Sequence, residues 1–186
     1  LADEQAEFGG SLLGNRQKIN GSDCMEWVAS AVAELSAMEE VRLLVRSTVT
    51  GYYDHGFLTV LQKSPSGPCN FKYSPRERVW RVRAGHVVIA TGAIERPLVF
   101  PNNDRPGIML ASAVSAYLNR YAAVPGRRSL IFTNNDHAYE TALDLDAAGA
   151  TVAAVVDVRP NPQGQLPTKV RAKGINVISG HAIIDV

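Results

Sequence analysis

The chain of 186 residues has only two cysteines, Cys24 and Cys69, and they do not form a CxxC pair. This scarcity argues against a disulfide framework, a zinc site and a dithiol redox centre, so we expect two ordinary reduced thiols and no metal ion. Nineteen basic and eighteen acidic residues nearly cancel, and no basic run stands out. Neither nucleic acid nor a charged membrane surface is therefore expected as a partner.

Long apolar runs are missing as well. No stretch approaches the roughly 18–20 residues needed to cross a bilayer, and the first residues show neither a basic region nor an apolar signal core. These absences predict a cytoplasmic protein without a membrane segment. Hydrophobic residues make up 46% of the chain, which is enough for the core of one large or two small α/β domains.

The most informative segment is HVVIATGAIERP at residues 86–97. Its apolar residues at 86–90 predict a buried strand, and Thr91 and Gly92 predict a turn at the carboxyl end of that strand. A glycine at this place allows the backbone to approach a bound dinucleotide closely. The segment therefore predicts one edge of a dinucleotide site.

The first four residues, Leu-Ala-Asp-Glu, are typical of the end of a buried strand, so we expect the chain to be part of a longer polypeptide. In a nucleotide-binding βαβ unit, the second strand ends in an acidic residue that holds the ribose of the adenosine half. Asp3 or Glu4 fits that role, and the alternative is an exposed acidic turn. The short spacing from Asp3 to Gly9 and Gly10, where the backbone must turn past a cofactor, favours the ribose role.

Helix and strand signals alternate through the first 100 residues. Ser22 or Asp23 is expected to begin a helix that ends near Met38. The elements expected after it are a buried strand at 41–45, a hairpin of 47–53 and 57–63, an exposed loop at 64–75 and a strand at 78–83. Residues 1–100 are thus predicted to be a first dinucleotide-binding domain, truncated at its N-terminus and carrying a β-meander.

The remaining residues repeat a βαβ layout. Residues 101–125 are expected to form a linker and a helix at 111–121, and residues 126–186 a second Rossmann-like domain with an altered phosphate turn. Its expected elements are strands at 129–132 and 151–156, helices at 136–148 and 167–172, and last strands at 175–178 and 183–186, in one mostly parallel sheet. The predicted fold class is α/β with two Rossmann-like domains.

The phosphate turn of the second domain departs from the pattern G-x-G-x-x-G/A. Thr133 and Asn135 replace the first two glycines, whereas Ala138 keeps the small third position. Asp136 adds a negative charge at the helix N-terminus, which suits the helix dipole as a cap but repels a phosphate. We expect this second site to be weakened or lost. The alternative is an unusual ligand that contacts Asn134, Asn135 and His137. Without such a ligand, we expect His137 to be a solvated residue of the first helical turn.

Four segments of the chain, taken together, carry a resemblance to a known family. They are residues 3–13, 90–100, 103–111 and 133–139. They resemble the alpha subunit of heterotetrameric sarcosine oxidase. The resemblance spans essentially the whole chain. It is specific, because the substituted second turn is not shared with ordinary flavin disulfide reductases. It implies FAD/NAD-binding, disulfide-reductase-like domains in a chain that lacks the first G-x-G-x-x-G and the C-terminal folate-binding region.

The resemblance also implies a function. That family oxidises sarcosine to glycine, passing electrons from FAD to FMN to oxygen and making hydrogen peroxide, while tetrahydrofolate captures the one-carbon unit. The implied enzyme is an oxidoreductase acting on CH–NH donors, in which the alpha subunit assembles with beta, gamma and delta subunits. The amine-oxidising flavin belongs to the beta subunit, and the alpha subunit holds NAD+ tightly in its first dinucleotide-binding domain.

The cofactor-binding residues that the resemblance implies are Asp3, Glu4, Gly10, Ser11, Val49, Thr50, Thr91 and Gly92. In this assignment the acidic pair holds the adenosine ribose, and the glycine-serine pair lies along the cofactor. Val49 or Thr50 contacts the adenine through backbone groups, and Thr91 and Gly92 border the pyrophosphate. Because a glycine-rich turn and its helix N-terminus supply the main phosphate contacts, we expect this chain alone to bind NAD+ poorly and to be inactive.

No catalytic residue is predicted. The four histidines are scattered, and no Ser/His/Asp or Cys/His arrangement follows from their spacing. Glu95 and Arg96 are expected to form a local ion pair at the exit of the strand, because exposed pairs of this kind are common and contribute only about 0–1 kcal/mol.

Two alternative functions remain open. The chain could belong to the alpha subunit of a related flavin-dependent amino-acid or opine dehydrogenase, since those chains share the Ala-Thr-Gly-Ala and Arg-Pro region. It could also be an assembly module whose nucleotide folds persist without ligand.

Overall fold

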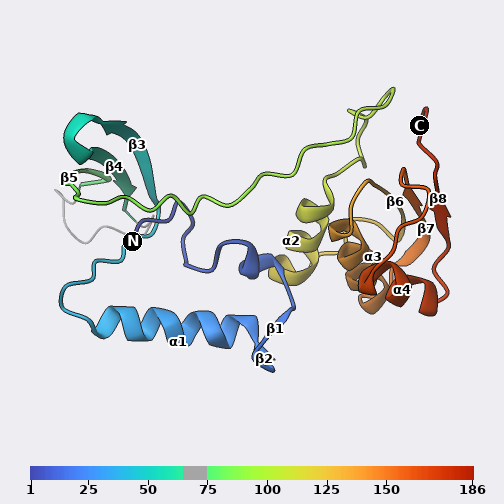
Figure 1. Cartoon of the computed structure of the whole chain (residues 1–186), viewed down its shortest axis with the longest axis horizontal. Coiled ribbons are helices and arrows are strands. Elements are labelled where there is room, and N and C mark those ends of the chain that lie inside the picture. The colour runs from blue at the N-terminus through green and yellow to red at the C-terminus, as the bar shows by residue number, and fades with distance from the viewer. Residues whose placement is uncertain (65–74) are drawn as a thin grey trace. The chain divides into compact units, whose positions relative to one another are not determined.

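The computed structural model describes residues 1–64 and 75–186. These residues fall into two compact units (Figure 1). Unit 1 comprises Leu1–Leu12 and Gln17–Gly92, and unit 2 comprises Leu13–Arg16 and Ala93–Val186. The predicted loop at 64–75 and Cys69 lie almost wholly outside the described residues. Both units mix helices with sheets, as expected for an α/β chain, and the assignment of a dinucleotide to either unit stays a prediction.

Unit 1 contains one long helix, α1 (Cys24–Ala37). It begins where the sequence predicts, because the Asp23 carboxylate accepts a hydrogen bond from the Met25 backbone N–H at 2.7 Å and so satisfies one of the free donors of the first turn. Cys24 and Val28 are the buried residues of the helix. A small antiparallel pair, β1 (Lys18–Ile19) and β2 (Ser22–Asp23), precedes the helix and was not predicted.

The meander of unit 1 is confirmed. Strands β3 (Ser47–Tyr53), β4 (Phe57–Lys63) and β5 (Glu77–Arg83) form an antiparallel sheet in the order β3-β4-β5. The short 3-10 turn η2 (Asp54–Gly56) joins the first two strands. Gly56 has a φ of 67°, and a Cβ atom at this position would overlap the Ala84 carbonyl oxygen. Only glycine fits this turn without distortion.

The N-terminal residues pair with the segment before β3. The Asp3 backbone N–H donates to the Leu44 carbonyl oxygen at 2.9 Å, and the Ser47 N–H donates to the Asp3 carbonyl oxygen at 2.8 Å. The predicted strand at 41–45 is wrong, since only Leu44 forms a bridge there, parallel to Ala2. Four backbone hydrogen bonds join residues 1–5 to residues 44–47, but they form one bridge and no continuous ladder along 41–45.

The predicted strand at 86–90 is also wrong. This segment has no regular structure, and its apolar side chains face solvent, with Val88 90% exposed. No described strand pairs with it. An apolar pattern shows where burial is favourable, but a strand forms only when a neighbouring strand accepts its backbone hydrogen bonds.

Unit 2 contains a parallel sheet with helical connections. Its strands are β6 (Arg128–Thr133), β7 (Thr151–Asp157) and β8 (Val177–Ser179), and its helices are α2 (Ala111–Tyr121), α3 (His137–Ala147) and α4 (Gln165–Ala172). The strands are parallel in the order β6-β7-β8, with α3 between the first two and α4 between the last two. The predicted β6-α3-β7 layout and the bounds of α2 are confirmed.

The strand predicted at 183–186 is absent, so that prediction is wrong. Asn102 donates instead to the Asp185 carboxylate at 2.5 Å, and Arg105 donates to the Val186 carbonyl oxygen. The last residues therefore contact the turn before α2 and add no strand to the sheet.

The core of unit 2 lies between its helices and its sheet. Its buried members are Leu118, Ile131, Ala138, Tyr139, Ala142, Leu145, Ala150, Val155, Val170 and Ile175. They come from all three helices, from β6 and β7, and from the loops next to them. One continuous core thus fixes the turn between β6 and α3.

A short N-terminal segment completes unit 2. Leu13 is buried, and the Gly14 carbonyl oxygen accepts a hydrogen bond from the Asn119 side chain of α2 at 3.0 Å. Asn119 also donates to the Asp144 carboxylate of α3 at 2.8 Å.

Among the described residues, no helix is both long and apolar enough to span a membrane.

Candidate functional site

Asp3 is the predicted ribose ligand whose position is best defined. Its main chain is hydrogen-bonded to Leu44 and Ser47, and its Oδ1 accepts from the Gln5 N–H at 2.8 Å. Its Oδ2 has no hydrogen-bond partner within residues 1–64 and 75–186. Asp3 is half-buried and Glu4 is exposed. A held carboxylate with one free oxygen suits a hydroxyl ligand.

Gly10 and Ser11 lie in the 3-10 turn η1 (Gly10–Gly14) and are exposed. Gly10 has a φ of 54°, and no atom lies within 4 Å of the place where a Cβ would stand. Gly10 therefore supplies the positive φ that the turn requires, and no side chain keeps a neighbouring molecule from its backbone.

Val49 and Thr50 lie on β3, an edge strand of the meander, and both are exposed. The pairing register shifts between Val49 and Gly51. The Thr50 hydroxyl lies 2.9 Å from that of Thr59 and donates to the Thr59 carbonyl oxygen at 3.2 Å. Because an edge strand has unpaired backbone groups along one side, β3 offers the backbone contacts expected for adenine.

Thr91 and Gly92 stand in the exposed segment without regular structure. Gly92 has a φ of 70°, and no atom lies near its missing Cβ. The structure therefore brings Asp3 to the residues that lead into β3, whereas it gives Thr91 and Gly92 no strand to fix their place.

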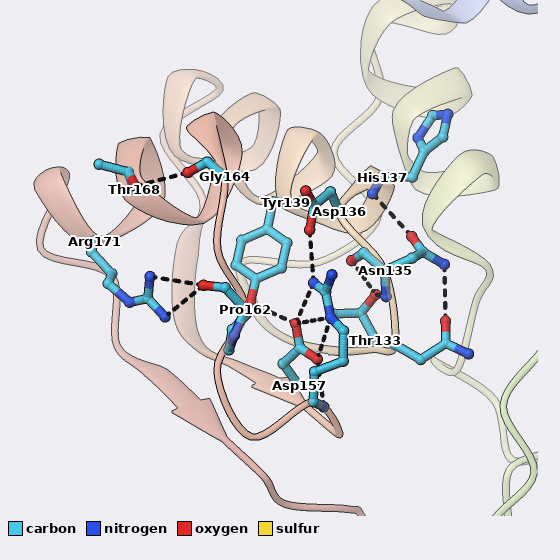
Figure 2. Close-up of polar contacts among 12 residues, drawn as sticks. Thr133, Asn135, Asp136, His137, Tyr139, Asp157, Pro162, Gly164, Thr168 and Arg171 are labelled. Atoms are coloured by element: carbon cyan, nitrogen blue, oxygen red, sulfur yellow. Dashed lines mark hydrogen bonds and ion pairs between the residues drawn. The ribbon is translucent and has the colours of Figure 1, made fainter.

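Unit 2 contains a polar cluster at the end of β7 (Figure 2), in which Asp157 and Tyr139 are buried while the side chains of Arg159 and Asp136 are 33% and 42% exposed. The Asp157 side chain is 0% exposed and accepts a hydrogen bond from the Tyr139 hydroxyl at 2.8 Å. The Arg159 guanidinium donates to both Asp157 oxygens through Nε, at 3.1 and 3.2 Å, and to Oδ2 through Nη2 at 2.7 Å. The same Nη2 donates to Asp136 Oδ1 at 2.7 Å. We call these four residues the Arg159 cluster.

The contacts of the Arg159 cluster shift the pKa values of Asp157, Tyr139 and Arg159. Burial alone would raise the pKa of Asp157, but the hydrogen bonds from Arg159 and Tyr139 outweigh it and hold that pKa below its usual value. Burial and the hydrogen bond to Asp157 raise the pKa of Tyr139 to about 12. Hydrogen bonds to Asp157 and Asp136 raise the pKa of Arg159. At neutral pH Asp157 is therefore a carboxylate, Arg159 a guanidinium and Tyr139 a neutral phenol.

The turn between β6 and α3 uses its own side chains as hydrogen-bond partners. The Asn135 N–H donates to the Thr133 hydroxyl at 3.2 Å, and that hydroxyl donates to the Asn135 carbonyl oxygen at 2.9 Å. The His137 N–H donates to Asn135 Oδ1 at 2.9 Å. Asn135 thus supplies the side-chain cap that we expected from Asp136, whose carboxylate binds Arg159 instead.

His137 contacts an acidic residue of its own helix. His137 is exposed at the start of α3, and its Nδ1 lies 3.9 Å from Glu140 Oε2. Within the described residues, no group of histidine, cysteine and acidic side chains could hold a metal ion.

Glu95 has a different role from the predicted ion pair with Arg96. Its carboxylate accepts from the N–H groups of Ala111 at 3.2 Å and Ser112 at 2.7 Å, at the first turn of α2. An acid at this place satisfies free donors and interacts favourably with the helix dipole. The expectation was wrong because the partner lies 16 residues ahead in the sequence, where local spacing gives no sign of it.

Sequence similarity identifies the relatives of this chain. No protein-family model matches it. The sarcosine oxidase subunit alpha of Corynebacterium sp. (strain P-1) is 46% identical over 100% of the chain. The chain resembles sarcosine oxidase alpha subunits. The same subunit is 47% identical over 86% of the chain in Rhizobium meliloti (strain 1021), and 41% identical over 98% in Corynebacterium sp. (strain U-96).

The extent of this similarity limits what it shows. The chain spans 19%, 16% and 19% of those three subunits, about a fifth of their length at most. The predicted resemblance is confirmed, and it concerns this stretch of the longer subunits.

A solved structure shares the fold. L-proline dehydrogenase from P. horikoshii superposes on 88% of the chain and 31% of its own length, with a TM-score of 0.62 and 23% sequence identity. At this identity the likeness concerns the fold alone.

Proposed function

We propose that this chain is a non-catalytic, NAD+-binding part of a sarcosine oxidase alpha subunit. The observation that carries the proposal is 41–47% identity to three subunits of that name across 86–100% of the chain. In the assembled enzyme, sarcosine is oxidised to glycine with formation of hydrogen peroxide, and the one-carbon unit passes to tetrahydrofolate. FAD and FMN carry the electrons, and beta, gamma and delta subunits complete the heterotetramer.

Unit 1 supports NAD+ binding through the groups that it leaves open. Asp3 has a carboxylate oxygen free to accept from a ribose hydroxyl, and the backbones of Gly10 and Gly92 have no neighbouring atoms where a side chain would stand. In this proposal these groups bind and orient NAD+, and β3 contacts its adenine through backbone groups. NAD+ itself is a nicotinamide hydride carrier, and no residue of unit 1 is assigned a catalytic step.

The enzymatic part of the proposal is tested on the full-length subunit. Coexpression with its partner subunits should give a flavin-containing complex that makes hydrogen peroxide when sarcosine is added. A complex that oxidises proline or another imino acid, and leaves sarcosine untouched, would favour a related amino-acid or opine dehydrogenase. A complex without either activity would favour an assembly module.

The cofactor assignment has a separate test. NAD+ released from the purified full-length subunit should be identified by mass spectrometry, at about one per chain. Asp3→Asn should weaken NAD+ binding about tenfold or more, because a charged hydrogen-bond acceptor is lost.

Asp54→Asn is the matched control, since Asp54 is an exposed acid in the turn between β3 and β4. Equal NAD+ content in the Asp3 and Asp54 variants would contradict the role of Asp3.

A further inference from the structure

The layout of unit 2 implies a nucleotide site that its residues do not fit. In a β6-α3-β7 unit of this kind, a dinucleotide needs free N–H donors at the turn before the helix, and an acid at the end of the second strand for its ribose. Asp157 stands at the end of β7, and the turn at 133–136 stands before α3. Asp157 and two of the N–H groups at this turn, those of Asn135 and His137, already have intramolecular partners.

The first of these groups is the set of backbone N–H donors at the turn before α3. The N–H groups of Asn135 and His137 are bound by side chains of the turn itself. The Asp136 carboxylate lies beside the helix start, with its Oδ2 3.1 Å from where a Cβ of Gly164 would stand. A pyrophosphate would therefore have to displace two hydrogen bonds and approach a negative charge.

The second group is Asp157, the acid at the end of β7 that would hold the ribose of a dinucleotide. Asp157 has no exposed surface, and its two oxygens receive hydrogen bonds from Tyr139 and from the Arg159 side chain and backbone. Arg159 reaches from Asp157 to Asp136, so one guanidinium joins the strand end to the start of α3. These are the two places that a dinucleotide would have to bridge.

We propose that Arg159 is the internal occupant of the nucleotide position in unit 2, so that this unit binds no dinucleotide. The guanidinium is held by two carboxylates of its own chain, and a tethered partner acts at a high effective concentration with which a free ligand must compete. An arginine near such an acid can accommodate the 2′-phosphate of NADP. Here, however, a phosphate would enter beside Asp136 and Asp157, whose combined charge exceeds that of Arg159.

The proposal is tested by a residue-resolved titration of the 186-residue chain. Amide spectra of the isotope-labelled protein are recorded with ADP-ribose, NAD+ and NADP+ up to about 1 mM. The amide resonances of Asn135 and His137 should not move with any of the three compounds. A saturable shift at either amide would overturn the proposal, whichever compound causes it. Shifts at Asp3 or Gly10 are scored separately, because they concern the proposed site in unit 1.

The state of Arg159 in the wild-type protein gives a second readout. Its Nε–H should exchange slowly with water at neutral pH and keep its resonance when nucleotide is added. The exposed Arg127 of the same unit provides the reference for fast exchange. Equally fast exchange at Arg159 and Arg127 would show that the guanidinium is not held, and would contradict the proposal.

Variants provide the third readout. Arg159→Gln should lower the melting temperature of unit 2 by roughly 10 °C, because it leaves the buried Asp157 charge without its cation. Arg127→Gln should change it by no more than about 2 °C. If Arg159→Gln does not fold, Asp136→Asn keeps the Asp157–Arg159 contacts and should speed the exchange of the Arg159 guanidinium protons. Matching effects of the Arg159 and Arg127 variants, or unchanged exchange in Asp136→Asn, would overturn the proposal.

Discussion

Asp3 of unit 1 is predicted from the sequence to hold a ribose, and Asp157 of unit 2 ends β7, where a βαβ layout places such an acid. The surroundings of the two acids differ. Asp3 keeps one carboxylate oxygen without a partner, whereas Asp157 is buried and bound by Tyr139 and Arg159. The two acids thus differ in whether the protein itself supplies partners for both carboxylate oxygens. The state of the acid depends on neighbours that the strand pattern does not reveal.

The two units also differ in how much they bury. Unit 2 has one core with contributions from three helices and two strands. The meander of unit 1 buries Leu58 and Val60 of β4, but leaves Val49 and Tyr52 of β3 half or more exposed. We therefore expect core substitutions to affect unit 2 most strongly, and backbone substitutions to have their largest effect in unit 1.

The largest expected effect is a cavity in unit 2. Leu145 is 1% exposed, and Leu145→Ala should lower the free energy of unfolding by about 4 kcal/mol, because it removes buried contacts and leaves a void. Leu130→Ala is the matched control, since Leu130 of the same unit is 53% exposed and should lose less than about 1 kcal/mol. Urea unfolding measures both, and equal losses would refute the contrast between core and surface.

The next effect is a loss of stability at high pH. The pKa of Tyr139 is about 12 in the folded chain and about 10 when unfolded. Between these values the folded state keeps a proton that the unfolded state has released, so the free energy of unfolding falls as the pH rises from about 10 to about 12. The loss should be about 3 kcal/mol.

Tyr139→Phe should remove this pH dependence, and Tyr121→Phe, which changes an exposed tyrosine of unit 2, should retain it. Thermal unfolding at a series of pH values compares the two variants. A wild-type curve that stays flat up to pH 12 would show that the Tyr139 hydroxyl is not held as described.

A smaller effect is expected at the turn of the meander. Gly56→Ala should cost about 2–3 kcal/mol, because the new Cβ meets the Ala84 carbonyl oxygen at a positive φ. Gly21→Ala should cost only about 1 kcal/mol, since Gly21 also has a positive φ but open space around its Cβ position. Hydrogen exchange of β3 and β4 amides measures the difference. Similar costs would mean that the turn relaxes around the added carbon.

The smallest effect is expected at the start of α2. Glu95→Gln should cost about 1 kcal/mol, because a neutral amide is a weaker partner for the Ala111 and Ser112 N–H groups and for the helix dipole. Glu34→Gln, an exposed change on α1, serves as the control. The difference should shrink at high salt, which screens the interaction of a charge with the helix dipole. A difference that persists in about 1 M salt would argue against a charge effect.

Much of the fold could be predicted from local pattern, and the reason is visible in the elements themselves. Asp23 caps α1 through its own side chain, and the three residues Asp54-His55-Gly56 set the hairpin of β3 and β4. These elements are specified by residues that are neighbours in the sequence. The segment at 86–90 was mispredicted because its state depends on a pairing partner, which no local pattern contains.

The contacts of the candidate sites were less predictable. A strand was predicted at 151–156, directly before Asp157, but the partner of Asp157, Tyr139, lies 18 residues away, and Arg159 also reaches Asp136 across 23 residues. A signal was present in the Asp-x-Arg spacing that begins at the last residue of β7, which places an acid and a guanidinium within reach of each other. The eight residues assigned to NAD+ remain a prediction, because they lie in separate segments, and within residues 1–64 and 75–186 the backbone links Asp3 to the approach to β3.

Residues 13–16 have a consequence for how the chain can be divided. They belong to unit 2, although unit 1 supplies the residues on both sides of them. The polypeptide therefore passes from one unit to the other three times, and unit 2 is a discontinuous domain. A clone that began at Ala93 would lack the buried Leu13 and the Gly14 acceptor of Asn119. Unit 2 consequently cannot be exchanged between related proteins as one uninterrupted segment, and a recombination point near residue 93 would separate it from part of its own structure.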